Sequence, residues 1–102
     1  MNASIALQIL PETTNDEQVI KVVDEVIAYM KSSGLNCYVG PFETAVEGDI
    51  DQLMDMLKEC MHIAARANQG GIMAFMKLTY RPEGDVLTIE KKVTKHHLDD
   101  KE

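Results

Sequence analysis

The sequence has few of the features that mark disulfide-rich, zinc-binding, membrane or secreted proteins. Only two of its 102 residues are cysteines, Cys37 and Cys60, which are too few for a disulfide framework or a zinc site. No stretch approaches the roughly 20 apolar residues of a membrane span, and the N-terminus does not begin with a basic segment followed by an apolar one. These absences predict a cytoplasmic protein whose two reduced cysteines pack as small hydrophobic side chains.

Positive charge is also scarce. The chain has 10 Lys and Arg against 17 Asp and Glu, so its net charge is -7. Because nucleic-acid binding requires a basic face, this balance argues against a nucleic-acid partner. An acidic surface favours a small cationic ligand, although in most proteins it serves only solubility.

Residue patterns typical of catalysis are missing as well. His62 falls in a predicted helix, and His96 and His97 lie near the end of the chain, where we expect them to be solvated. Their spacing pairs none of them with a nucleophile and completes no metal site. Gly70 and Gly71 precede a strand instead of opening a helix, so they do not form a phosphate loop. We therefore expect a protein that is not an enzyme and holds no metal or cofactor.

The hydrophobic content, 45%, is that of a folded chain, and the length suits one domain. We expect a single domain over residues 1–97 and a charged tail over residues 98–102. Residues 3–10 alternate between an apolar face and a mixed one, which predicts a strand stopped by Pro11. Residues 14–17, Thr-Asn-Asp-Glu, resemble a capping box in which Thr14 caps a helix that ends near Gly34.

The centre of the chain predicts a hairpin that leads into a second helix. Apolar runs at residues 35–39 and 42–46 are separated by Gly40 and Pro41, a pair that favours a tight turn. Asp49 then begins a helix that ends at Gly70 and Gly71. Its predicted buried stripe is Ile50, Leu53, Met54, Leu57, Cys60, Met61, Ala64 and Ala67. We interpret its methionines as core filling and not as metal ligands.

The last third predicts a strand over residues 72–80, a turn at residues 82–85 and a short helix over residues 86–93 with Thr88 as a possible cap. The full order is then β-α-β-β-α-β. This is the ferredoxin-like pattern of the α+β class: an antiparallel four-stranded sheet with two helices on one face. The short C-terminal helix is an addition to this pattern.

The last strand is apolar on both faces. Ile72, Ala74 and Met76 alternate with Met73 and Phe75, and a strand of this kind needs cover on both sides. We expect the patch of Met73 and Phe75, extended by Ala6 and Ala45, to pack sheet against sheet in a homodimer or homotetramer. The alternative is that the C-terminal helix folds back and covers the patch within one chain.

Four segments together resemble the YkoF-like thiamine-binding family. They are Leu10-Pro11, residues 40–44 (Gly-Pro-Phe-Glu-Thr), residues 46–49 (Val-Glu-Gly-Asp) and residues 87–93 (Leu-Thr-Ile-Glu-Lys-Lys-Val). They occur in the family's order over nearly the whole chain. The resemblance implies a ferredoxin-like fold, assembly through open sheet faces, and binding of thiamine or its hydroxymethylpyrimidine part. It carries over directly to Thr44, Glu47 and Gly48.

The chemistry of four residues suits such a ligand. Thiamine has a cationic thiazolium ring and an aminopyrimidine with donor and acceptor atoms. Carboxylate and hydroxyl groups bind such atoms, and an aromatic face stacks on the rings. Glu47, Thr44, Gln8 and Tyr38 supply these groups. Strict alternation places Thr44 and Glu47 on opposite faces of their strand unless the strand bulges, and Glu47 has the alternative role of favouring the N-terminus of the helix that follows.

These observations favour a non-catalytic protein that binds thiamine or hydroxymethylpyrimidine for transport, salvage or sensing of the vitamin. Two alternatives remain open at this stage. One is an enzyme of the ferredoxin-like dimeric-barrel type, and the other is a regulatory module that binds another small metabolite. Fold alone does not separate them.

Overall fold

The structure is a computed structural model, and it describes residues 1–97. The predicted charged tail, residues 98–102, lies outside the described residues. The elements follow in the order β1 (Ala3–Pro11), α1 (Asp16–Ser32), β2 (Asn36–Val39), β3 (Thr44–Gly48), α2 (Ile50–Asn68), β4 (Ile72–Tyr80), α3 (Ile89–Val93) and a 3-10 turn (Thr94–His96). Through β4 this is the predicted β-α-β-β-α-β order, and α3 is the predicted C-terminal helix.

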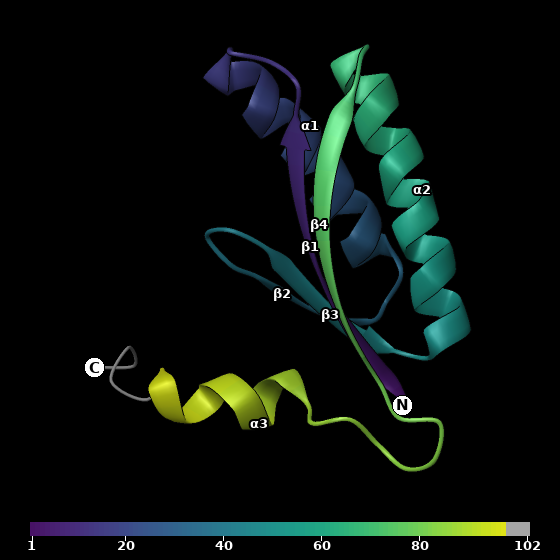
Figure 1. The fold of residues 1–102 in the computed structure, drawn as a ribbon. Helices are drawn as coiled ribbons and strands as arrows, with labels where there is room; N and C mark the ends of the chain where they lie inside the picture. The colour runs from purple at the N-terminus through teal and green to yellow at the C-terminus, as the bar shows by residue number, and fades with distance from the viewer. Residues whose placement is uncertain (98–102) are drawn as a thin grey trace.

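The four strands form one antiparallel sheet in the order β2-β3-β1-β4. Helices α1 and α2 lie side by side against one face of this sheet (Figure 1). The prediction of an α+β ferredoxin-like fold is therefore confirmed. The register gives the opposite face, here called the open face, a defined set of residues: Ser4, Ala6, Gln8, Leu10, Asn36, Tyr38, Ala45, Glu47, Met73, Phe75, Lys77 and Thr79.

The main core lies between the sheet and the two helices. The predicted alternation of β1 is confirmed, because Ala3, Ile5, Leu7 and Ile9 are all buried. They pack with residues of α1 and α2 that recur at helical spacing, namely Val22, Val26, Met30, Leu53, Met56, Leu57, Cys60 and Ala64. Gly48, at the end of β3, is closely packed: a Cβ there would lie 3.1 Å from Cδ1 of Leu35.

The predicted stripe of α2 is wrong at one methionine. Met54 is 49% exposed, whereas Met56 is buried in the core. The buried stripe runs through Leu53, Met56, Leu57 and Cys60, and at 100° per residue Met54 falls on its flank. The interpretation of methionine as core filling holds for Met56.

Both helix starts differ in detail from the prediction. The cap of α1 is Asn15 and not Thr14, because the Asn15 Oδ1 accepts hydrogen bonds from the backbone amides of Glu17 and Gln18 at 2.9 and 3.2 Å. Asp49 precedes α2 as expected, but its side chain makes no capping bond. The amide of Ile50 donates instead to Oδ1 of Asn2, from a distant part of the chain, at 2.9 Å.

The predicted hairpin is present, with a later start for its second strand. The amide of Gly40 donates to the carbonyl oxygen of Glu43 at 2.9 Å. This bond closes a four-residue turn that includes Phe42 and Glu43, so β3 begins only at Thr44. Strand β4, in contrast, has the predicted bounds, Ile72–Tyr80.

Helix α3 folds back across the end of the sheet that holds β2 and β3, away from α1 and α2 (Figure 1, yellow). Val86 and Ile89 at its start are buried, although neither belongs to the main core. Thr88 is its cap, accepting a bond from the amide of Lys91 at 3.1 Å. The helix does not cover the apolar patch on β4, because Met73 and Phe75 remain 53% and 55% exposed.

Candidate functional site

The four residues predicted to bind the ligand fall into two groups. Thr44 pairs with Leu7 and lies on the helix-covered face, whereas Glu47 pairs with Ser4 and lies on the open face. The pairing is continuous from Thr44 to Gly48, so no bulge brings the two side chains together. Thr44 and Gln8 both line one cavity, although from opposite faces of the sheet, and Tyr38 and Glu47 lie beside α3.

The first group lines a cavity between β1, α1 and the turn at residues 40–43. Because β3 begins opposite Leu7, the end of β1 from Gln8 onward has β4 on one side and, among the described residues 1–97, no strand on the other. The cavity occupies this gap and has a volume of about 300 Å³, at the lower end of the usual range for ligand pockets. It is lined by Leu7, Gln8, Ile9, Leu10, Val19, Ile20, Val23, Asp24, Ile27, Gly40, Pro41, Phe42, Glu43 and Thr44.

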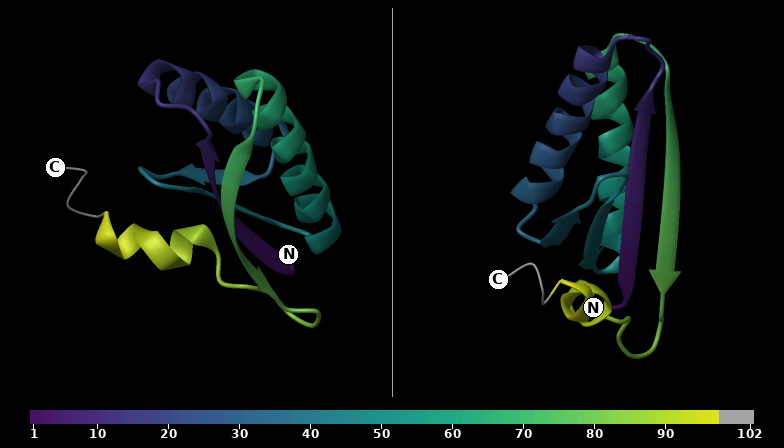
Figure 2. Two further views of the ribbon diagram at one scale, coloured as in Figure 1. Left: turned by 45° about the horizontal axis from the view of Figure 1, so that its top comes forward. Right: turned by 90° about the vertical axis from the view of Figure 1, so that its left-hand side faces the viewer.

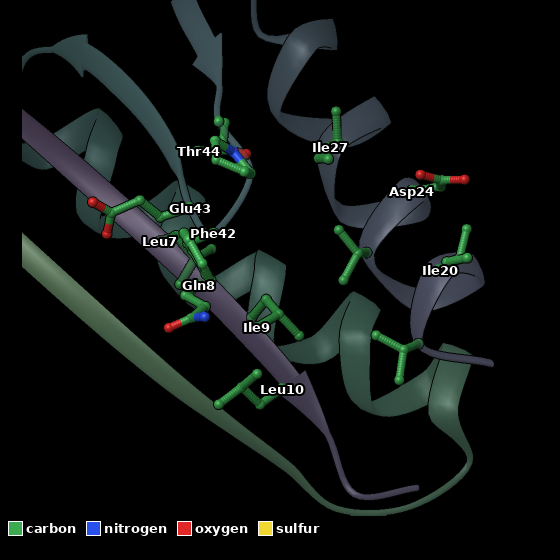
Figure 3. Close-up of a pocket in the computed structure, with 14 residues that line it drawn as sticks. Leu7, Gln8, Ile9, Leu10, Ile20, Asp24, Ile27, Phe42, Glu43 and Thr44 are labelled. Atoms are coloured by element: carbon green, nitrogen blue, oxygen red, sulfur yellow. The ribbon is translucent and has the colours of Figure 1, made fainter. Parts of the chain in front are cut away.

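Polar groups stand at the border of this largely apolar cavity (Figure 3). Thr44 lies at the start of β3 and is only 6% exposed. Gln8 and Glu43 extend on the side of β1 away from α1, and Asp24 lies on α1 itself. Phe42 at the tip of the turn is 78% exposed. A hydroxyl, an amide, two carboxylates and an aromatic ring are therefore available around one cavity.

The Glu43 carboxylate already has a cationic neighbour. Its Oε1 lies 3.1 Å from Nζ of Lys77, which extends from the open face of β4. Lys77 is largely exposed, and an exposed pair of this kind contributes little to stability. A cationic ligand can therefore replace Lys77 beside this carboxylate at low cost.

The second group holds α3 against the sheet. Glu47 is 8% exposed, and its Oε2 accepts a hydrogen bond from the amide of Ile89, the first residue of α3, at 2.8 Å. Its Oε1 accepts from Nδ2 of Asn36 on β2 at 2.9 Å. A carboxylate at a helix N-terminus satisfies an amide that has no partner within the helix. The sequence predicted such a helix-start role at the helix that follows Glu47, α2, but the helix it contacts is α3.

Tyr38 belongs to the same contact. Its hydroxyl lies 3.0 Å from Nε2 of His97, and the two rings are tilted with centroids 6.0 Å apart. His97 was expected to be solvated; it is exposed, but it contacts the sheet through Tyr38. A hollow of about 370 Å³ lies here, between β2 and α3. Tyr38 and Glu47 are thus placed to fix α3 and do not line the cavity that holds Gln8 and Thr44.

Of the polar and aromatic residues that line the first cavity, sequence reasoning missed three: Asp24, Phe42 and Glu43. Phe42 and Glu43 were assigned to a strand, where alternation would have turned them to opposite faces. The Gly40-Pro41 pair was the available signal, since it places both residues in a turn. Asp24 directly follows Val23, on the flank of the apolar stripe of α1.

Two other features are absent from residues 1–97. No three His, Cys, Asp or Glu side chains are grouped so that they could hold a metal ion. Within the same range, no helix has both the length and the apolar character that crossing a membrane requires.

Comparison with known proteins gives consistent matches over nearly the whole chain. The family described as "Thiamine-binding protein" matches residues 5–97. UPF0045 protein CPE1503 of Clostridium perfringens is 37% identical over 93 residues, which are 91% of this chain and 95% of that protein. The solved structure of protein SP2199 of Streptococcus pneumoniae is 38% identical with a TM-score of 0.78, covering 92% of this chain and 99% of that one.

A third relative has a name that proposes a role. Protein TM0486 of Thermotoga maritima, named for thiamine biosynthesis or salvage, is 27% identical. Its structure superposes with a TM-score of 0.81, covering 94% of this chain and 99% of that one.

Proposed function

The chain belongs to the thiamine-binding protein family, and on that premise we propose that it binds thiamine or its hydroxymethylpyrimidine part without turning it over. The observation that carries this proposal is the cavity between β1, α1 and the turn at residues 40–43, where Thr44 and Gln8 meet Phe42, Glu43 and an apolar wall. A bound thiamine would make the protein part of vitamin salvage, transport or sensing.

The cavity matches the two halves of the ligand. The apolar residues of α1 and β1 accept the flat face of the aminopyrimidine, and the Thr44 hydroxyl on the same side of the sheet offers a donor and an acceptor to its edge. The Gln8 amide offers further donors and acceptors from the open-face side of β1. The Glu43 carboxylate attracts the cationic thiazolium, and the exposed ring of Phe42 stacks on it. The net charge of -7 adds a long-range attraction for the cation.

We assign Gln8 and Thr44 to ligand contact within this proposal. Glu47 and Tyr38 stay predictions as ligand contacts, because in the free protein both bond within the contact that fixes α3. A ligand that reached Glu47 would first have to displace the amide of Ile89.

Calorimetric titration with thiamine, thiamine diphosphate and hydroxymethylpyrimidine tests the proposal. We expect binding of at least one compound without any change in it on prolonged incubation. If none of the three binds at millimolar concentration, the proposed function is wrong. Turnover of a bound compound would favour the enzyme alternative instead.

Replacing Thr44 by Val tests the cavity. This change keeps the shape of the side chain and removes its hydroxyl, so the ligand loses one hydrogen bond, with a cost of about 0.5–1.5 kcal/mol in binding. Thr79→Val is the matched control. It removes the same hydroxyl from an exposed position on β4 that does not line the cavity. Equal affinities of the two variants would place the ligand elsewhere.

We also propose that the protein assembles through its open sheet faces into a homodimer or homotetramer. Supporting this are the exposed side chains of Leu10, Met73 and Phe75, which adjoin one another on the open faces of β1 and β4. An exposed apolar patch on so small a protein usually marks an interface.

A further inference from the structure

Strand β1 has a free backbone edge where β3 ends, and this edge faces the cavity. The pairing of β1 with β3 stops at Leu7 and Thr44, whereas its pairing with β4 continues to Pro11. Figure 2, right, shows the β2–β3 hairpin beside only the lower part of β1, near the N-terminus. Ile9, beyond this part, and Phe42 in the turn both line the cavity. The register of β1 and β3, continued by two residues, would have made these two residues partners.

Two hydrogen bonds at the ends of β1 fix which of its backbone groups point toward β4. The amide of Arg81 donates to the carbonyl oxygen of Asn2 at 2.7 Å, and the amide of Glu12 donates to the carbonyl oxygen of Gly71 at 3.0 Å. Backbone groups alternate between the two sides of an antiparallel strand, so the even-numbered residues of β1 bond to β4. The N–H and C=O of the odd-numbered residues, Ile9 among them, point to the other side.

The N–H and C=O of Ile9 have no hydrogen-bond partner among residues 1–97. Pro11, the next residue on this edge, has no N–H, and its carbonyl oxygen accepts from the amide of Thr13 at 2.9 Å. Ile9 is only 7% exposed. Because buried backbone groups almost always have a partner, this donor and acceptor at the wall of a cavity indicate a place for a polar ligand edge.

We propose that the backbone N–H and C=O of Ile9 bind the aminopyrimidine edge of the ligand. The inference rests on the proposed function and names the groups that recognise the pyrimidine. The N–H donates to the ring nitrogen next to the amino group, and the C=O accepts from the amino group. An extended residue presents its N–H and C=O to the same side, and the edge of an aminopyrimidine carries an acceptor and a donor in the complementary order. The ligand thus bonds to a strand edge through main-chain groups, in the place that Phe42 would have had in a longer β3.

The side chains around Ile9 suit a flat ring bound in this way. Ile20 and Ile27 of α1 line the cavity on the side toward which the Ile9 side chain turns, and Gln8 and Leu10 extend to the other side (Figure 3). A ring bonded edge-on to the strand therefore meets apolar side chains of α1 with one face. Since main-chain groups bind the pyrimidine, no polar residue type at position 9 marks the site in the sequence.

An amide-to-ester change at Ile9 tests the donor. The α-hydroxy acid of isoleucine at this position keeps the side chain and replaces the N–H by oxygen. The probe is the tightest-binding of thiamine, thiamine diphosphate and hydroxymethylpyrimidine, which all carry the aminopyrimidine edge. We expect its dissociation constant, measured by calorimetry, to rise at least about fivefold.

The matched control is the same change at Val39. The amide of Gly40 bonds to Glu43, so by alternation the amide of Val39 points away from β3, at the outer edge of β2. Each ester also weakens the carbonyl group before it, which bonds to a neighbouring strand, so the two variants should lose similar stability. The Val39 ester should bind the probe as the wild type does. Circular dichroism checks that both variants are folded.

Two measurements on the wild type test the same contact without a change in the protein. An analogue of the probe with hydrogen in place of the amino group leaves the Ile9 carbonyl oxygen without a donor, and it should bind at least about fivefold more weakly. Hydrogen exchange at the Ile9 amide should slow when the probe binds, while exchange at the Val39 amide stays the same. These two measurements decide the question if the Ile9 ester does not fold.

The outcomes separate this inference from the proposed function. A probe that binds the Ile9 and Val39 esters equally well overturns the inference, and so does an analogue that binds as tightly as the probe. Unchanged exchange at the Ile9 amide in the complex overturns it as well. In each of these cases a ligand still binds and the proposed function stands. If none of the three compounds binds the wild type, the proposed function is wrong and the inference fails with it.

Discussion

At the scale of single residues, burial decides which side chains are chemically available. The two thiols illustrate this. Burial raises the pKa of the Cys60 thiol to about 11, helped by the nearby Glu59 carboxylate. Burial also raises the pKa of Cys37, while Lys31 opposes the shift. Neither thiol is therefore a reactive thiolate at neutral pH, in keeping with the expectation that both act as small hydrophobic side chains.

Alkylation rates compare the reactivity of Cys60 with that of Cys37. At pH 8 a thiol with a pKa of about 11 is a thiolate on the order of one part in a thousand. We expect iodoacetamide to label native Cys60 far more slowly than Cys37, which is only half-buried, and to label both quickly in denaturant. Peptide mass spectrometry gives the two rates. Rapid labelling of native Cys60 would contradict its burial.

The same shift has a consequence for stability. The unfolded thiol loses its proton near pH 9, its usual value, and the folded one only near pH 11. The contribution of the buried neutral Cys60 thiol to the free energy of unfolding is therefore fully present below pH 9 and is lost as the pH rises through 11.

Residue roles were harder to predict than residue positions. Alternation correctly separated Thr44 from Glu47, because it depends only on the geometry of one strand. It did not reveal that Glu47 meets Ile89, since that contact joins residues 42 positions apart. Which helix N-terminus the Glu47 carboxylate contacts depends on tertiary packing, and the sequence around Glu47 does not encode that packing.

At the scale of elements, α3 is the segment most dependent on single contacts. Its buried start is tied to the sheet by the Glu47 carboxylate, through Ile89 on one oxygen and Asn36 on the other. Glu47→Ala leaves both donors without a partner and should cost about 1–3 kcal/mol. Glu47→Gln should cost less, because one oxygen remains as an acceptor and the Asn36 amide can turn. Glu90→Gln, an exposed change on the same helix, should stay within about 0.5 kcal/mol.

Denaturation gives these energies, and hydrogen exchange at the amides of Ile89 and Lys91 shows whether α3 is released. Protection that persists in a folded Glu47→Ala protein would mean that other contacts hold the helix. Calorimetric titration of the Glu47→Gln variant with thiamine, thiamine diphosphate and hydroxymethylpyrimidine tests whether Glu47 contacts the ligand. A loss of about 1–3 kcal/mol in affinity would indicate ligand contact, whereas unchanged affinity leaves Glu47 with its role at α3.

Elements with a strong local pattern were predicted closely. The bounds of β4 were correct because a long alternating run follows a pair of glycines. The start of α1 was wrong by one residue at its cap, since Thr14 and Asn15 both suit a capping position and only backbone geometry selects Asn15. The cavity was not predicted, because it depends on β3 being shorter than β1, a relation between two strands that neither sequence contains alone.

At the scale of the whole molecule, Phe75→Asp tests the proposed assembly through the open sheet faces. The variant places a carboxylate in the exposed patch of the open face, so face-to-face packing should be lost and particles should become smaller by light scattering. Secondary structure should be unchanged. A particle size equal to that of the wild type would rule out assembly through the open face at Phe75.

The place of β1 in the sheet also fixes when the protein can fold. Within residues 1–97, β1 pairs only with β3 and β4, and its partners in β4 lie up to 77 positions further along the chain, from Ala3 to Tyr80. The hairpin of β2 and β3 and the two long helices involve near neighbours and can form while the chain is being made. The central strand stays open along one side until residue 80 has left the ribosome. The first strand made thus acquires its last neighbour only after 80 residues have been synthesised.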